Sequence, residues 1–247
     1  MDPSLYKERF YRGWQHPEHL VPHEVRCGET DLQVFTGEGV CSRAVRKRLI
    51  SLVLKYRAQL EETIKKFPPF LTSLVPVDFA SDHEMIRRMV AVSRAAGVGP
   101  MAGVAGAVAE FVGTGMLAIT DEIIVENGGD VFLRSGADRT ALVYAGEGSP
   151  FRDRVRIKIR GRSTPVGLAT SSRKIGSSLS FGNTDATLII AGSALAADVF
   201  ATTVGNMVKG EKDLPRALEY ARTRAEISGG LILIGDRLAA FGEIELA

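Results

Sequence analysis

Two oxygen-bearing residues, Asp198 and Thr202, lie four positions apart in the segment SALAADVFATTVGNMV at 193–208. This segment is predicted to be a helix that begins at Ser193, so the carboxylate and the hydroxyl project from the same face, one turn apart. Hard oxygen ligands at this spacing are typical of Mg²⁺ sites, in which water and substrate phosphates complete the coordination. The spacing is common, however, and the alternative is that Thr202 hydrogen-bonds within its own helix while Asp198 is solvated.

A second candidate is the turn-like stretch Asn127, Gly128, Gly129 and Asp130, which lies between two apolar runs. Asn-Gly is the strongest short-range signal for a β-hairpin, because the turn needs the positive φ that glycine adopts at no steric cost. Two adjacent glycines also allow the backbone to lie directly against a ligand. The sequence therefore predicts a hairpin turn, and it leaves open whether this turn is also one wall of a binding site.

A third candidate is the stretch TSSRKIGSSLSFGNTD at 170–185, which contains five serines and two threonines. Hydroxyls, backbone N–H groups and the adjacent cations Arg173 and Lys174 are donors of the kind that phosphate oxygens require. A flexible surface loop has a similar composition, which is the alternative reading. The candidate ligand-binding residues in this stretch are Ser171, Ser172, Ser177 and Ser178.

The elements that must position these residues follow from the hydrophobic pattern. Six short segments between residues 122 and 192 are predicted strands: EIIVE, DVFLR, TALVY, RVRIKIR, VGLAT and ATLIIAG. Several follow one another without an intervening helix, which predicts a largely antiparallel sheet with helices segregated to one side, an α+β fold. Two further hairpins are expected, one within 22–35 and one around Gly235 and Asp236.

Helices are predicted before and after these strands in the sequence. In the first, apolar residues recur at spacings of three and four from Val45 to Ile64, and its basic residues favour a solvated face over nucleic-acid binding because no aromatic residues interleave with them. A capping box of Ser81 and Glu84 is expected to open the second. The third begins at Pro100. Its many alanines and glycines predict a close approach by another helix or a ligand, and the turn at 99–103 is expected to face the site.

Composition sets the remaining limits. The chain has 247 residues and a formal net charge of +2, so no overall field would recruit nucleic acid. It has neither an N-terminal signal-type apolar region nor an apolar run of about 18 residues, which predicts a cytoplasmic protein without membrane contact. Cys27 and Cys41 lack the spacing of a zinc or disulfide framework. A single domain over 1–247 is expected. The sequence leaves open whether it is divided into two subdomains, with the chain crossing between them in the proline-rich stretch near 67–80.

The chain resembles the ApbE-like superfamily, and within it an uncharacterised family of short cytoplasmic relatives. The resemblance rests on GPMAGVAGAVAEF, VENGGDVF, TSSRKIGSSLSFGNTDA and ADVFATTVGN in this order, with ETDLQV near the N-terminus, and it covers nearly the whole chain. It implies an ApbE-like, T-fold-like architecture and a Mg²⁺-dependent transferase that splits FAD and attaches FMN to a Thr or Ser of a target protein. In that family the glycine-rich turn lies against the flavin nucleotide, and the Asp and Thr that correspond to Asp198 and Thr202 bind the metal.

The departures from the transferase pattern bear on activity. The transferases carry a His-x-x-Asp-Pro segment before the metal helix, whereas the four histidines here, His16, His19, His23 and His83, all lie in the first third of the chain. A transferase lysine is also missing, since the corresponding stretch reads GVAGAVAEF. No catalytic residue is therefore assigned. Two functions stay open, a phosphoryl or FMN transferase and a non-catalytic module that binds a flavin, purine or pterin-like ligand. The acceptor protein and the homo-oligomeric state also stay open.

Overall fold

The computed structural model describes residues 9, 12–13, 15, 17–173 and 181–247. Its main feature is one antiparallel sheet of eight strands in the order β1-β2-β3-β4-β7-β8-β9-β10. These strands are β1 Leu20–Cys27, β2 Thr30–Gly37, β3 Ile123–Asn127, β4 Asp130–Ser135, β7 Arg162–Ser171, β8 Ala186–Ala191, β9 Ile227–Ile234 and β10 Arg237–Gly242. A separate hairpin consists of β5 Arg139–Val143 and β6 Val155–Ile159. The predicted α+β fold is confirmed.

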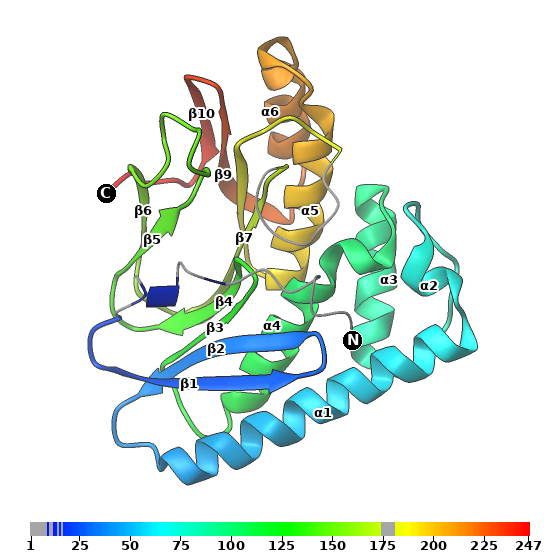
Figure 1. The fold of residues 1–247 in the computed structure, drawn as a ribbon, viewed down its shortest axis with the longest axis vertical. Coiled ribbons are helices and arrows are strands. Elements are labelled where there is room, and N and C mark those ends of the chain that lie inside the picture. Colours follow the sequence, from blue (N-terminus) through cyan, green and yellow to red (C-terminus); the bar gives the residue numbers. More distant parts are fainter. Residues whose placement is uncertain (1–8, 10–11, 14, 16, 174–180) are drawn as a thin grey trace.

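The helices gather on one face of the sheet (Figure 1). They are α1 Ser42–Lys66, α2 Pro69–Thr72, α3 Glu84–Ala96, η3 Pro100–Gly103, α4 Val104–Met116, α5 Ala194–Met207, η4 Glu211–Asp213 and α6 Leu214–Arg222. The larger hydrophobic core lies between this layer and the sheet, and Leu49, Met89, Val112 and Phe200 are fully buried in it. The β5-β6 hairpin covers the other face, where Ile157 and Leu231 belong to a second core.

The alternation of buried and exposed side chains explains why the strands were readable from sequence. Along β6 the residues alternate strictly, with Val155, Ile157 and Ile159 buried and the residues between them at least partly exposed. The hairpin turns also fall where predicted, because Gly28 and Gly235 supply the positive φ that a tight turn requires. All six strands expected between 122 and 192 are present.

One predicted helix start is wrong. The expected capping box of Ser81 and Glu84 is absent, since α3 begins at Glu84 with His83 as its N-cap and without a side-chain cap bond. The Ser81 hydroxyl instead accepts a hydrogen bond from the backbone N–H of His83 at 3.1 Å. The Ser81 side chain therefore stabilises a local turn that precedes α3, and its hydroxyl does not cap the helix.

The proline-rich stretch near 67–80 contains only the one-turn helix α2, in which Pro69 occupies an N-terminal position. The division of the chain into one domain, or into subdomains at this point, stays a prediction. Among the described residues, no single helix is both long and apolar enough to cross a membrane, although α3 together with η3 and α4, bent by 107°, passes by length and composition alone.

Candidate functional site

The Asn127–Asp130 turn joins β3 to β4 and is held against the start of α4. Gly128 and Gly129 have φ values of +72° and +103°, so the turn depends on glycine at both positions. The Asn127 side-chain amide donates a hydrogen bond to the Ala105 carbonyl at 3.1 Å. The turn is therefore a hairpin turn, as predicted, and it is fixed in place by the first turn of a buried helix.

Two carboxylates, Asp130 and Asp198, are buried beside this turn. Their exposed fractions are 7% and 8%. Asp198 lies on α5, and its Oδ2 accepts a hydrogen bond from the backbone N–H of Gly106 at 2.9 Å. The backbone of Ala105 also hydrogen-bonds this carboxylate. Asp198 is therefore not solvated, and it lies at the N-terminus of α4, where an anion is favoured.

Burial dominates the electrostatics of this pair. Desolvation raises the pKa of Asp198 from 3.8 to about 7, although the N–H groups of Gly106 and Ala105 oppose the change. The pKa of Asp130 is also raised well above its usual value, first by burial and then by the negative charges of Asp198 and Glu126. Within the described part of the chain, neither carboxylate has an ion-pair partner within 4.0 Å. Two buried acids with raised pKa values and no such partner form a site where a cation would replace protons.

Thr202 follows Asp198 by one helical turn and is also buried, with an exposed fraction of 9%. Residues four apart on a helix share a face, so its hydroxyl lies on the side of α5 that carries Asp198. No group of three or more His, Cys, Asp or Glu in the described residues could hold a metal ion. A Mg²⁺ site needs only one or two protein carboxylates together with oxygen ligands from water and phosphate, and the pair with Thr202 fits that set.

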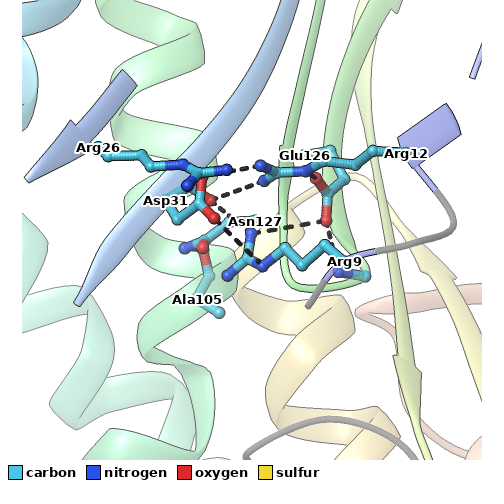
Figure 2. Close-up of polar contacts among 8 residues, drawn as sticks. Arg9, Arg12, Arg26, Asp31, Ala105, Glu126 and Asn127 are labelled. Atoms are coloured by element: carbon cyan, nitrogen blue, oxygen red, sulfur yellow. Dashed lines mark hydrogen bonds and ion pairs between the residues drawn. The ribbon is translucent and has the colours of Figure 1, made fainter. Parts of the chain in front are cut away.

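A second cluster of charged residues lies directly beside the turn and was not identified from the sequence (Figure 2). The Arg12 guanidinium lies between two buried carboxylates, 2.7 Å from Asp31 Oδ1 and 2.9 Å from Glu126 Oε2. Arg9 approaches the same carboxylates at 3.8 and 3.9 Å and donates a hydrogen bond to the Asp31 carbonyl. A methyl group on Gly128 would lie 3.5 Å from the Arg9 guanidinium. The arginines of the N-terminal segment therefore lie over the turn.

These arginines distinguish the two acid pairs. Burial opposes ionisation of Asp31, but the hydrogen bond and positive charge of Arg12 outweigh it and lower the pKa of this carboxyl. The pKa of Arg12 is raised despite its own burial, because Glu126 and Asp31 stabilise the cation. Asp31 and Glu126 are thus paired with Arg12, whereas Asp130 and Asp198 have no ion pair among the described residues, although the charge of Arg9 opposes the raised pKa of Asp130 from a distance. The sequence signal for the cluster was weak: two arginines in a polar N-terminal segment, Asp31 as one of two acids in ETDLQV, and Glu126 as one of two acids in VENGGD.

The serine-rich stretch is only partly described. Ser171 is the last residue of β7 and Ser172 follows it, buried with an exposed fraction of 6%. The preceding residue, Thr170, hydrogen-bonds the Asp130 carboxylate through its backbone, so the end of β7 lies next to the Asn127–Asp130 turn. Ser177 and Ser178 lie outside the described residues. The prediction that all four serines line one cleft with Gly128 and Gly129 therefore stays a prediction.

Two open cavities lie elsewhere on the molecule. One, of about 480 Å³, is lined by residues of the β5-β6 hairpin and the C-terminus, including Phe151 and Leu246. The other, of about 470 Å³, is lined by Arg173, Asn183 and Lys209 among others. Neither is lined by the candidate metal ligands. The site at the turn is instead a buried cluster that the side chains of Arg9 and Arg12 contact.

The close approach expected at the helix after Pro100 is made by another helix, α5. A side chain at Gly103 would collide with Val199 and would approach Leu195 Cδ1 to 2.7 Å, and one at Gly106 would approach Asp198 Cβ to 2.7 Å. The glycines thus allow α4 to pack closely on α5. The anion at the first turn is the protein's own Asp198, so a ligand is not needed to explain the small residues.

The comparisons with known proteins agree with this architecture. The sequence model of the family described as "AbpE bacteria" matches residues 14–225. A UPF0280 protein of Methanocaldococcus jannaschii is 39% identical over 204 residues, which cover 80% of this chain and 82% of that protein. A UPF0280 protein of Methanocella arvoryzae is 35% identical over 79% of this chain and 80% of that protein.

Solved structures show the same fold at low identity. The flavinyl transferase ApbE of Pseudomonas stutzeri, in its apo form, superposes with a TM-score of 0.55 and 12% identity, covering 90% of this chain and 93% of the other. The ApbE protein of Thermotoga maritima gives a TM-score of 0.57 and 11% identity, covering 92% and 97%. The predicted ApbE-like architecture is therefore confirmed, and the sequence match over most of the chain shows that it belongs to the AbpE bacteria family.

Proposed function

We propose that this protein binds a flavin nucleotide together with Mg²⁺ at the Asn127–Asp130 turn and transfers FMN from FAD to a hydroxyl of an acceptor protein. The observation that carries the proposal is the pair of buried carboxylates, Asp130 and Asp198, which lacks an ion-pair partner in the described residues. Flavin transfer is the activity named for the solved ApbE structures of the same fold. We extend that activity to this chain because the glycine-rich turn, Asp198 and Thr202 correspond to the flavin-binding and metal-binding residues of the ApbE-like pattern.

Each residue of the site has a defined part in this proposal. The carboxylate of Asp198 and the hydroxyl of Thr202 would hold the metal from one face of α5, and the buried Asp130 carboxylate would add negative charge beside them. Bound Mg²⁺ supplies Lewis-acid stabilisation of the charge that develops on a transferred phosphate. The glycines of the turn would allow the backbone to lie against the planar ring of a flavin, and Ser171 and Ser172 bring hydroxyls to the adjacent end of β7.

The second candidate function is ligand binding without transfer. The observation that favours it is the segment before the metal helix, which reads FGNTDA at 181–186 and contains no histidine. Asn183 and Asp185 there are engaged with protein: the Asn183 amide donates to the Lys209 carbonyl at 2.9 Å, and Asp185 accepts from the Gly235 N–H at 3.1 Å. General acid-base chemistry near a nucleotide would need another group.

The deciding experiment measures binding and turnover on the same protein. FAD binding is measured by calorimetry with and without Mg²⁺. Release of AMP from FAD, with water as the acceptor of the FMN phosphate in place of the protein hydroxyl, is followed by chromatography. The proposal expects Mg²⁺-dependent binding and AMP release, both lost in Asp198→Ala and retained in Asp78→Ala, which removes a fully exposed carboxylate. Binding without AMP release would assign the chain to the second candidate. Absence of any FAD or Mg²⁺ binding would reject both.

A further inference from the structure

The outer face of α1 carries apolar side chains that nothing in the described part of the chain covers. This helix runs along the lower edge of the molecule in Figure 1, with its inner face against α4, β1 and α3. Val45, Leu49 and Tyr56 are buried on the inner face. On the opposite face, Ile50 and Leu54 have exposed fractions of 41% and 52%. The helix is therefore apolar on two sides, although only one of them packs within its own chain.

The exposed residues follow a symmetric pattern. Lys47, Ile50, Leu54, Ala58 and Glu61 are all exposed and are spaced by three, four, four and three residues. At about 100° per residue they fall within one stripe about 80° wide, roughly opposite the buried face. The spacing of the stripe is symmetric about Leu54: apolar residues, Ile50 and Ala58, lie four positions to either side, and a cation and an anion lie seven positions to either side.

We propose that two copies of this chain associate through this stripe, with their α1 helices antiparallel and the two-fold axis at Leu54. Under this symmetry each residue lies opposite the one equally far from Leu54 on the other side, so that the contacts form twice. Lys47 then faces the partner's Glu61, Ile50 faces the partner's Ala58, and the two Leu54 side chains meet at the axis. The apolar centre is flanked by one ion pair on each side.

The charges of α1 favour the antiparallel over the parallel orientation of such a pair. The first half of the helix is basic, with Arg43, Arg46, Lys47 and Arg48, so a parallel pair would bring like charges together. Lys47 has no ion-pair partner within the described part of the chain. Glu61 pairs with Arg57 of its own helix, yet its side chain is 64% exposed. It can therefore accept a second cation at the rim of the contact.

The same symmetry also constrains the crossing angle. Arg43 and Lys65 lie eleven residues on either side of Leu54 and would face each other as like charges in a nearly aligned pair. Packing of i±4 ridges into each other's grooves gives a crossing of about 50°, which separates the helix ends while the centre stays in contact. Ile50, Leu54 and Ala58 form such an i±4 ridge. The spacing and the repulsion therefore both favour the steeper crossing.

The size of the contact sets its strength. A helix of 25 residues is about 37 Å long, and two helices that cross at a steep angle bury less than the roughly 1,600 Å² of a standard interface. We therefore expect a dimer with a Kd in the micromolar range, in equilibrium with monomer.

The test is a charge exchange measured by sedimentation equilibrium from low to several hundred micromolar protein. Lys47→Glu places a carboxylate opposite the partner's Glu61, and Glu61→Lys places two cations together, so each single variant is expected to raise the dimer Kd at least tenfold. The double variant Lys47→Glu with Glu61→Lys restores opposite charges and is expected to return the Kd to within threefold of the original. A double variant as weakly associated as the singles would overturn the antiparallel register.

A second pair of variants tests the apolar centre. Leu54→Glu is expected to abolish the dimer at all concentrations, because two carboxylates would meet at the axis. The matched control is Leu246→Glu. Leu246 has an exposed fraction of 55% and is the residue before the C-terminus, which lies away from α1 (Figure 1). Circular dichroism and melting temperature establish that each variant is folded. The proposal is overturned if the unmodified chain is monomeric throughout the range, or if Leu54→Glu still dimerises.

Discussion

Replacing Asp198 by Asn tests how strongly the fold resists an unneutralised charge at the candidate site. Asn keeps the shape of the side chain and can still accept one hydrogen bond from the first turn of α4, but it cannot ionise. In the unmodified chain the pKa of Asp198 is raised from 3.8 to about 7 because the carboxyl is buried. The folded chain therefore binds this proton more tightly than the unfolded chain does, so protonation favours folding.

The sign and size of the effect follow from linkage. The contribution is fully favourable below about pH 4 and is lost as the pH rises through the folded pKa of about 7. A rise of the pKa from 3.8 to about 7 corresponds to about 4 kcal/mol in total, and more than half of this, on the order of 2–3 kcal/mol, falls between pH 5 and pH 8. Asp130 titrates in the same direction, and its pKa falls when the charge of Asp198 is removed, which adds to the difference.

The assay is urea unfolding followed by circular dichroism at about pH 5 and about pH 8 with a chelator present, on both chains. Carboxyls with lowered pKa values, such as Asp31 and Asp138, act in the opposite sense but are common to both chains and cancel in the comparison. We expect the unmodified chain to lose on the order of 2–3 kcal/mol more than Asp198→Asn over this interval. Parallel pH profiles would refute the reasoning that Asp198 is a buried, unpaired acid.

A metal arm extends the same measurement. At about pH 8, Mg²⁺ at a hundredfold excess over its Kd would stabilise the unmodified chain by about 2.7 kcal/mol, because it binds the folded state alone. Asp198→Asn removes a ligand and should gain much less. Equal stabilisation of the two chains by Mg²⁺ would remove Asp198 from the metal site while leaving the pH argument intact.

Three further substitutions test the packing and the turn. Arg12→Ala leaves two buried carboxylates without their closest cation. We expect the free energy of unfolding to fall by about 3 kcal/mol near neutral pH, and a loss below about 1 kcal/mol in urea unfolding would contradict the ion-pair argument. Gly103→Val forces a side chain into Val199 and should lower the free energy of unfolding by about 1–3 kcal/mol without changing the Mg²⁺ affinity. Weaker Mg²⁺ binding at an unchanged melting temperature would instead place this residue in the ligand site. Gly129→Ala places alanine at φ +103° and should lower the free energy of unfolding by about 1–3 kcal/mol. The control Gly148→Ala, with open space around it, should change it by less than about 0.5 kcal/mol. Equal effects would show that the turn tolerates a side chain.

Local chemistry explains why individual strands and turns could be predicted from the sequence. Period-two burial marks strands such as β6, and glycines with positive φ mark the turns at Gly28 and Gly235, because these signals depend on neighbouring residues alone. The placement of Asp198 and Thr202 on one helix face followed from spacing for the same reason. The false helix start at Ser81 shows the limit: a hydroxyl can bond to more than one nearby N–H, and the sequence does not say which.

The sequence by itself determined the antiparallel α+β architecture, the glycine turn at 127–130 and the placement of Asp198 and Thr202 one turn apart on the same helix. Tertiary structure alone decided that Asp130 meets Asp198, that the anion at the start of α4 is Asp198, and that Arg12 neutralises Asp31 and Glu126. These contacts join residues 19 to 114 positions apart. Burial, and with it the raised pKa of Asp198, exists only once distant elements have packed, because desolvation depends on what surrounds a group and not on its neighbours in the chain.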